Sequence, residues 1–234
     1  MNYAANVDSV IYAQESERAA FIRRTYMHLA MAVLAFIVIE YFLLQLPFAG
    51  AIASTMVGGY SWLIVLVAFM GVSWLAQNWA SSETSIQKQY MGLGLYVVAE
   101  AIIFLPILYI AANYSSPDVI PTAGVVTSFL FAGLTATVLI TRKDFSWMRS
   151  ILTIGGFVAL GLIAASIIFG FSLGIFFSAV MILFASGAIL YDTSNVLHHY
   201  RTDQHVAASL SLFASVALLF WYILRFFMSL SSDD

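Results

Sequence analysis

Cysteine is absent from this 234-residue sequence, and charged residues make up only 9% of it. The lack of cysteine excludes disulfide bonds, thiolate metal sites and cysteine nucleophiles. Soluble domains carry about 25% charged residues, so a chain with few charges and 62% hydrophobic residues cannot cover a water-facing surface. The composition therefore predicts an integral membrane protein. We expect the lipid bilayer as its surroundings and no nucleic acid among its partners.

Long apolar runs divide the sequence into seven windows of about 20 residues, the length that a helix needs to cross a bilayer. The windows are Thr25–Leu46, Ser61–Ala80, Tyr90–Ala112, Thr122–Thr141, Ile151–Gly170, Leu173–Thr193 and Val206–Met228. We therefore predict an all-α polytopic membrane protein with seven transmembrane helices in one domain, residues 25–229. A polar tail, residues 1–24, precedes this domain, and a short tail, residues 230–234, follows it. The first tail lacks the apolar core of a signal peptide, so the first span is expected to be retained.

Lysine and arginine fall in alternate loops of this predicted topology. They precede the first span and follow the second, fourth and sixth, as Arg18, Arg23, Arg24, Lys88, Arg142, Lys143, Arg149 and Arg201. Loops 47–60, 113–121 and 171–172 contain neither residue type. Because cytoplasmic loops carry an excess of Lys and Arg, the N-terminus is predicted to be cytoplasmic and the C-terminal tail to lie outside.

Four ionisable residues lie within the spans: Glu40, Glu100, Asp192 and Arg225. Such residues cost a few kcal/mol on insertion scales, so a functional role is the default hypothesis. Glu40 and Arg225 lie at similar depth toward the outer side, which is compatible with an ion pair. The alternative is that each reaches the outer interface separately by snorkelling. Glu100 lies in mid-span, where it either lines a polar cavity or stays neutral and donates a hydrogen bond to a neighbouring helix.

Asp192 lies near the cytoplasmic end of the sixth span and shares a helix face with Asn195 and His199, because residues three and four apart align. Ser215 of the seventh span offers a further polar group. These side chains predict a polar funnel between spans six and seven, open to the cytoplasm. The alternative is a helix end whose polar residues only meet lipid headgroups.

Catalysis and metal binding are not expected. An intramembrane aspartyl protease needs two carboxylates on adjacent helices, and the seventh window contains no Asp or Glu. His198, His199, Asp203 and His205 are interpreted as solvated loop residues, because a metal site needs several ligands held in fixed geometry. The sequence therefore indicates no catalytic residue, no metal site and no cofactor.

Three segments resemble the Bax inhibitor family of seven-span membrane proteins: Ile189–Asn195 with the sequence Ile-Leu-Tyr-Asp-Thr-Ser-Asn, Thr141–Ser146 after span four, and Arg24-Thr25-Tyr26 at the start of span one. The continuation after Asn195 is most similar to the bacterial YccA-like branch. This resemblance implies a bacterial inner-membrane regulator that binds and modulates the membrane-anchored AAA protease FtsH. It also implies that the protease engages a cytoplasmic N-terminal tail.

Another branch of the family implies an alternative function, a pH-sensitive calcium or cation leak. In that branch a carboxylate at the position of Asp192 faces a second one on span seven, where this chain has Ser215. One carboxylate with a serine holds a divalent cation less well than two carboxylates do. The leak would then use Asp192 with Asn195 and Ser215 as neutral ligands or proton-sensing partners, and Glu100 could contribute a further acidic group.

Overall fold

The computed structural model describes residues 9–82 and 84–231, and these form helices joined by short loops. The elements are η1 (Val10–Tyr12), α1 (Glu15–Leu44), α2 (Ala49–Val57), α3 (Ser61–Ala80), α4 (Ile86–Tyr114), α5 (Val119–Thr141), α6 (Met148–Phe169), α7 (Gly174–His198) and α8 (His205–Ser231). Seven of the described helices are long and apolar enough to cross a membrane. This confirms the predicted all-α polytopic architecture.

The structure differs from the predicted spans at the N-terminal side. Helix α1 begins at Glu15, well before the predicted start at Thr25. Glu15 and Glu17 occupy its first turn, where acidic side chains interact favourably with the positive end of the helix dipole. Much of the predicted 1–24 tail is therefore helix. The short helix α2 was not predicted either, because nine residues are too few to cross a bilayer.

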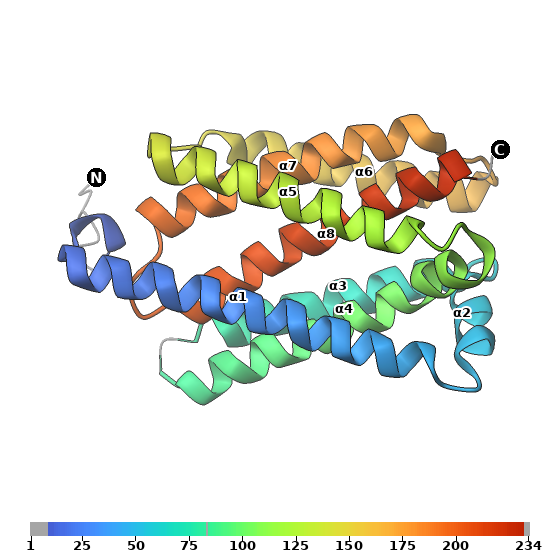
Figure 1. Ribbon diagram of the computed structural model, residues 1–234, viewed down its shortest axis with the longest axis horizontal. Coiled ribbons are helices and arrows are strands. Elements are labelled where there is room, and N and C mark those ends of the chain that lie inside the picture. The colour runs from blue at the N-terminus through green and yellow to red at the C-terminus, as the bar shows by residue number, and fades with distance from the viewer. Residues whose placement is uncertain (1–8, 83, 232–234) are drawn as a thin grey trace.

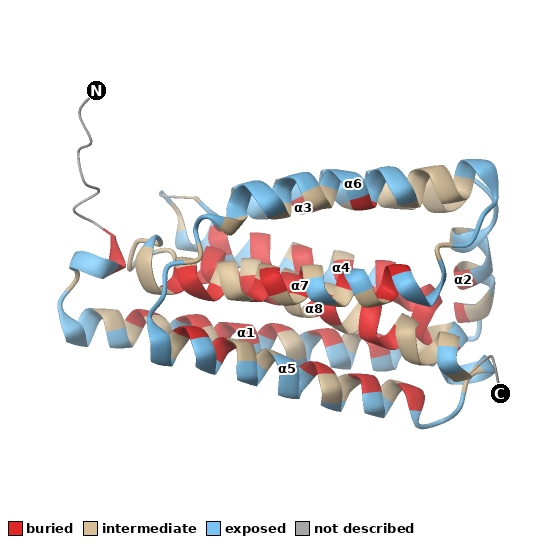
Figure 2. Cartoon of the chain, turned by 90° about the horizontal axis from the view of Figure 1, so that it is seen from above, coloured by how far each residue is buried: buried red, intermediate tan, exposed pale blue. Residues whose placement is uncertain are grey.

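Helix α8 lies at the centre of the bundle. It crosses obliquely between α5, α6 and α7 on one side and α1, α3 and α4 on the other (Figure 1). It contacts α1, α3, α4, α5 and α7. Buried residues accordingly gather on α4, α7 and α8, whereas α6 is exposed along its length and buries only Ala159 (Figure 2). The apolar outer faces suit lipid, which is as apolar as their side chains.

Helices α3 and α4 approach each other closely at Gly92. A Cβ atom added there would lie 2.5 Å from the Ala76 carbonyl oxygen and 2.5 Å from the Ala80 nitrogen. Only glycine fits against the backbone of α3 at this distance, and small residues allow this kind of helix contact in membranes. The α3–α4 pair thus forms a fixed support on one side of α8.

The loop cations of the described chain gather at one end of the bundle. The start of α1, the end of α7, the start of α8 and the α3–α4 and α5–α6 loops all lie there, whereas α2 lies at the opposite end (Figure 1). We call the first end the cation-bearing end. The distribution of Lys and Arg predicts that this end faces the cytoplasm.

Candidate functional site

The structure brings Asp192 of α7 against Ser215 of α8. The Ser215 hydroxyl donates a hydrogen bond to Asp192 Oδ2 over 2.5 Å. This distance is typical of a hydroxyl that donates to a carboxylate. The bond joins the two helices in the half of the bundle that leads to the cation-bearing end.

A second carboxyl approaches the same region from α4. Glu100 is buried, and the buried phenol of Tyr96 lies one turn before it on α4. Tyr96 is close enough to both Glu100 and Asp192 to interact electrostatically with each. Asp192 is thus within electrostatic range of the phenol that neighbours Glu100, and no direct bond between the two carboxyls is among the described contacts.

The α5–α6 loop folds over the end of α7. Helix α5 ends at Arg142, which adopts the left-handed conformation with φ 52°. The Ser194 hydroxyl then accepts the Phe145 backbone N–H at 2.9 Å and donates to Asp144 Oδ1 at 3.3 Å. Asp144 also contacts His199 Nε2 at 3.3 Å. The two most specific family-like segments, 141–146 and 189–195, are thus in direct contact.

Hydrogen bonding determines the ionisation of Asp144, which lies outside the spans. Partial burial alone would raise the pKa of its carboxyl. The Ser146 backbone N–H and the neighbouring His199 outweigh that effect and lower the pKa below its usual value. Asp144 is therefore a carboxylate at neutral pH, and it holds the loop against α7 in that form.

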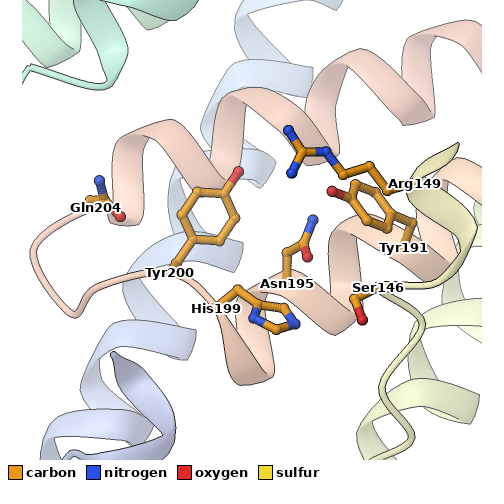
Figure 3. A pocket seen from close by; sticks show the side chains of 7 residues that line it. All are labelled: Ser146, Arg149, Tyr191, Asn195, His199, Tyr200 and Gln204. Carbon is orange, nitrogen blue, oxygen red and sulfur yellow. The ribbon is translucent and has the colours of Figure 1, made fainter. Parts of the chain in front are cut away.

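Beside this loop lies a cavity of about 750 Å³, which we call the loop cavity. Its lining side chains are those of Ser146, Arg149, Tyr191, Asn195, His199, Tyr200 and Gln204 (Figure 3). The Asn195 amide occupies its middle, between Tyr200 on one side and Tyr191 with Arg149 on the other (Figure 3). Asn195 thus faces this cavity.

Tyr200 lines the loop cavity and also lies near Asp192. Its hydroxyl lies 3.0 Å from the Ser211 hydroxyl of α8. Burial, followed by the nearby charge of Asp192, raises the pKa of Tyr200 to about 12. The phenol is therefore neutral at physiological pH and forms a polar wall rather than a charged one.

The N-terminal end of the described chain is attached to the same region. Ser9 Oγ donates to the His198 carbonyl at 2.8 Å, and the Val10 N–H donates to the Tyr200 carbonyl at 2.9 Å. The Val10 side chain is fully buried, with 0% exposure. We call Ser9 and Val10 the N-terminal anchor. No local sequence pattern predicts this anchor, because its partners lie almost the whole chain length away.

The ion pair considered possible for Glu40 and Arg225 does not form in the structure. Glu40 is buried in α1, and neither of its carboxyl oxygens has a hydrogen-bond partner in the described part of the chain. Arg225 instead lines a separate cavity of about 340 Å³ with Pro106 and Trp221. Two residues at equal depth lie at the same level of the membrane, but the helix faces that carry them need not point toward each other.

The interpretation of His205 as a solvated loop residue is also wrong. His205 is the first residue of α8 and is buried. Its ring lies 4.9 Å from that of His28 on α1, and His28 Nε2 is 3.1 Å from the Tyr90 hydroxyl on α4. Across residues 9–82 and 84–231, no three His, Asp or Glu side chains gather as a metal site would require. These three rings instead join α1, α4 and α8.

These features define a class of protein: a polytopic membrane protein whose described residues form seven spanning helices, with α8 at their centre and a polar site at the cation-bearing end. The family model described as "Inhibitor of apoptosis-promoting Bax1" matches residues 18–232. The chain belongs to the Bax inhibitor family.

Curated relatives cover most of the chain. The "Modulator of FtsH protease YccA" of Escherichia coli is 34% identical over 202 residues, which are 82% of this chain and 89% of that protein. An uncharacterized protein of Pseudomonas aeruginosa is 30% identical over 230 residues, 95% of each chain. The plant protein LIFEGUARD 4 of Arabidopsis thaliana is 26% identical over 218 residues, 90% of this chain and 85% of its own.

Proposed function

We propose that this chain is an inner-membrane protein that binds the membrane-anchored AAA protease FtsH and modulates it, without a reaction of its own. The observation that carries the proposal is the similarity to YccA, whose name describes it as a modulator of that protease, across 82% of this chain. The similarity runs over nearly the whole bundle, so it concerns the protein as a unit and not a shared short motif.

The N-terminal anchor gives the proposal a structural basis. A protease of this class would engage a terminal segment on the cytoplasmic side, where η1 and the start of α1 lie. With the anchor closed, the chain is fixed to the bundle from Ser9 onward. With the anchor open, the segment from Ser9 to Gln14 would be released as well, which adds about 20 Å of reach. The anchor would therefore set how readily the protease grips this chain.

The energetics allow such an anchor to open. Burial of the Val10 side chain contributes about 1.5–3 kcal/mol, and each of the two hydrogen bonds adds about 0.5–1.5 kcal/mol. Ordering of the segment opposes these terms at about 1–2 kcal/mol per residue. The closed and open forms thus differ by a few kcal/mol at most, and a bound partner can shift such an equilibrium.

The test uses FtsH and this chain purified together in proteoliposomes with ATP. We expect the two proteins to co-purify, and we expect degradation of a standard membrane substrate to slow as this chain is added. A chain that lacks residues 2–8 should resist its own degradation. Failure to recover the protease, with substrate degradation unchanged, would refute the proposal.

Val10 and Tyr12 provide a matched pair of variants for the anchor. Val10→Asp places a charge in a fully buried position, whereas Tyr12→Asp places the same charge on a residue that is 66% exposed. Val10→Asp should shorten the half-life of this chain in the presence of FtsH several-fold. Tyr12→Asp should leave it within twofold of the wild type. Equal half-lives for the two variants would exclude the anchor from this role.

A second candidate function, a proton-sensitive cation leak, is favoured by one observation. Glu100 is buried one turn from the Tyr96 phenol, which is also within electrostatic range of Asp192. Ser215 and Asn195 would then act as neutral ligands or proton-sensing partners of Asp192. Acid-dependent calcium flux in liposomes that disappears in Asp192→Asn would support this function, and flux unaffected by that change would exclude Asp192 as the gate.

A further inference from the structure

We propose that the loop cavity binds a phosphate group, carried either by a lipid headgroup or by a small soluble phosphate. The cavity lies at the cation-bearing end, between the start of α6 and the end of α7. Its polar side chains come from both helices and from the loop that follows α7 (Figure 3). This inference does not depend on the proposed action on the protease.

Hydrogen-bond donors without a protein partner converge on the cavity. Among the described contacts, the Arg149 guanidinium and the Asn195 amide form no hydrogen bond to another residue. Both point into the same space as the Tyr191 hydroxyl (Figure 3). The side-chain carbonyl oxygen of Gln204 accepts the Arg201 backbone N–H at 3.1 Å, so the NH₂ group of the same side-chain amide remains available. A planar guanidinium with neighbouring amides is suited to the oxygens of a phosphate.

The surrounding charges favour an anion. The closest carboxylate on the loop, Asp144, is already engaged by Ser194, the Ser146 backbone and His199. Asp203 is engaged by Arg201 at 2.8 Å. Arg149 therefore has no carboxylate partner in the described chain, and Arg142 and Lys143 on the same loop add further positive charge. An anionic ligand would provide the missing counter-charge.

The volume and the position of the loop cavity agree with a ligand that carries a phosphate group. A volume of about 750 Å³ lies within the range of about 300–1,000 Å³ that is usual for small-molecule sites. Basic pockets between transmembrane helices on the cytoplasmic side are a recurring type of site for anionic headgroups. Phosphatidylglycerol carries one phosphate diester in its headgroup, and a soluble phosphate would enter from the aqueous side.

The experiment measures binding to the full chain in a neutral detergent after lipid removal. Phosphatidylglycerol, diacylglycerol with the same acyl chains, and inorganic phosphate are each titrated. Native mass spectrometry counts bound molecules, and the thermal unfolding midpoint reports stabilisation. We expect phosphatidylglycerol or inorganic phosphate to bind and to stabilise the protein, and diacylglycerol, which lacks the phosphate, to do neither.

Arg149→Gln and Lys143→Gln provide the matched comparison, since each removes one exposed positive charge, Lys143 from the α5–α6 loop and Arg149 from the first turn of α6, and only Arg149 lines the cavity. Affinity should fall at least fivefold in Arg149→Gln and less than twofold in Lys143→Gln. Tyr191→Phe, which removes one hydroxyl, should lose about twofold. Binding of phosphatidylglycerol alone identifies a lipid site, and binding of inorganic phosphate identifies a soluble ligand. No binding of either, or equal loss in the two charge variants, would overturn the proposal.

Discussion

The hydrogen bond between Ser215 and Asp192 makes a quantitative prediction about how α7 and α8 are held together. Ser215→Ala removes one oxygen from a well-packed interface, so the loss of packing is small. The larger effect is that Asp192 Oδ2 loses its only described donor, at 2.5 Å. Leaving a buried acceptor without a hydrogen-bond donor lowers the stability by about 1–3 kcal/mol.

Hydrogen-bond energies measured in membrane proteins give a second estimate of the free energy lost in Ser215→Ala. Interhelical hydrogen bonds in bilayers average about 0.6 kcal/mol and reach about 1.7 kcal/mol, and a charged acceptor roughly doubles the strength of a bond. We therefore expect Ser215→Ala to lower the free energy of unfolding by about 1–2 kcal/mol. A double-mutant cycle with Asp192→Ala should give a coupling energy of about 1 kcal/mol or more. The reason is that the double variant leaves no buried polar group of this pair without a hydrogen-bond partner.

The assay is reversible denaturation of the reconstituted protein, followed by circular dichroism. Ser128→Ala serves as the control, since the exposed Ser128 hydroxyl only donates to the Gly124 carbonyl of its own helix, at 2.8 Å. That variant should stay within about 0.5 kcal/mol of the wild type. A coupling energy below about 0.3 kcal/mol would show that the bond does not join the helices.

Further predictions concern the helix packing and the loop. Gly92→Ala should destabilise the protein by about 1–3 kcal/mol in the same assay, because its Cβ would meet α3 backbone at 2.5 Å, whereas Gly94→Ala, with nothing within 4 Å, should be neutral or slightly stabilising. Ser194→Ala should cost about 1–2 kcal/mol, since the Phe145 N–H loses its acceptor; an unchanged unfolding midpoint would contradict the described loop contact. The lowered pKa of Asp144 means that its stabilising effect is complete above its unfolded pKa of about 3.9 and is lost as the pH falls through the native value. The difference in thermal midpoint between wild type and Asp144→Asn should therefore shrink below about pH 4.

The fold was predictable from the sequence because each span is a continuous apolar run, and a bilayer permits little besides a helix for such a run. The helical segments that were not predicted are those that lack such an apolar run. Helix α2 is too short to span, and the extension of α1 to Glu15 is polar, so neither stands out by hydropathy. The cytoplasmic assignment of the N-terminus remains a prediction from the loop charges.

The candidate site was predictable only in part. The 3.6-residue period of a helix and the family resemblance together predicted that Ser215 lies opposite Asp192. The contact of Asp144 with His199 spans 55 residues, and that of Ser9 with His198 spans 189. Periodicity along one helix carries no information on such contacts. The Glu40–Arg225 prediction failed for the related reason that depth in the membrane does not determine which way a helix face points.

The most direct test of the central claim is the rate at which FtsH degrades a membrane substrate in proteoliposomes that contain increasing amounts of this chain. The proposed function predicts that the rate falls in a saturable manner, and that the protease is recovered in complex with this chain from the same vesicles. A degradation rate independent of the amount of this chain, with no complex recovered, would contradict it.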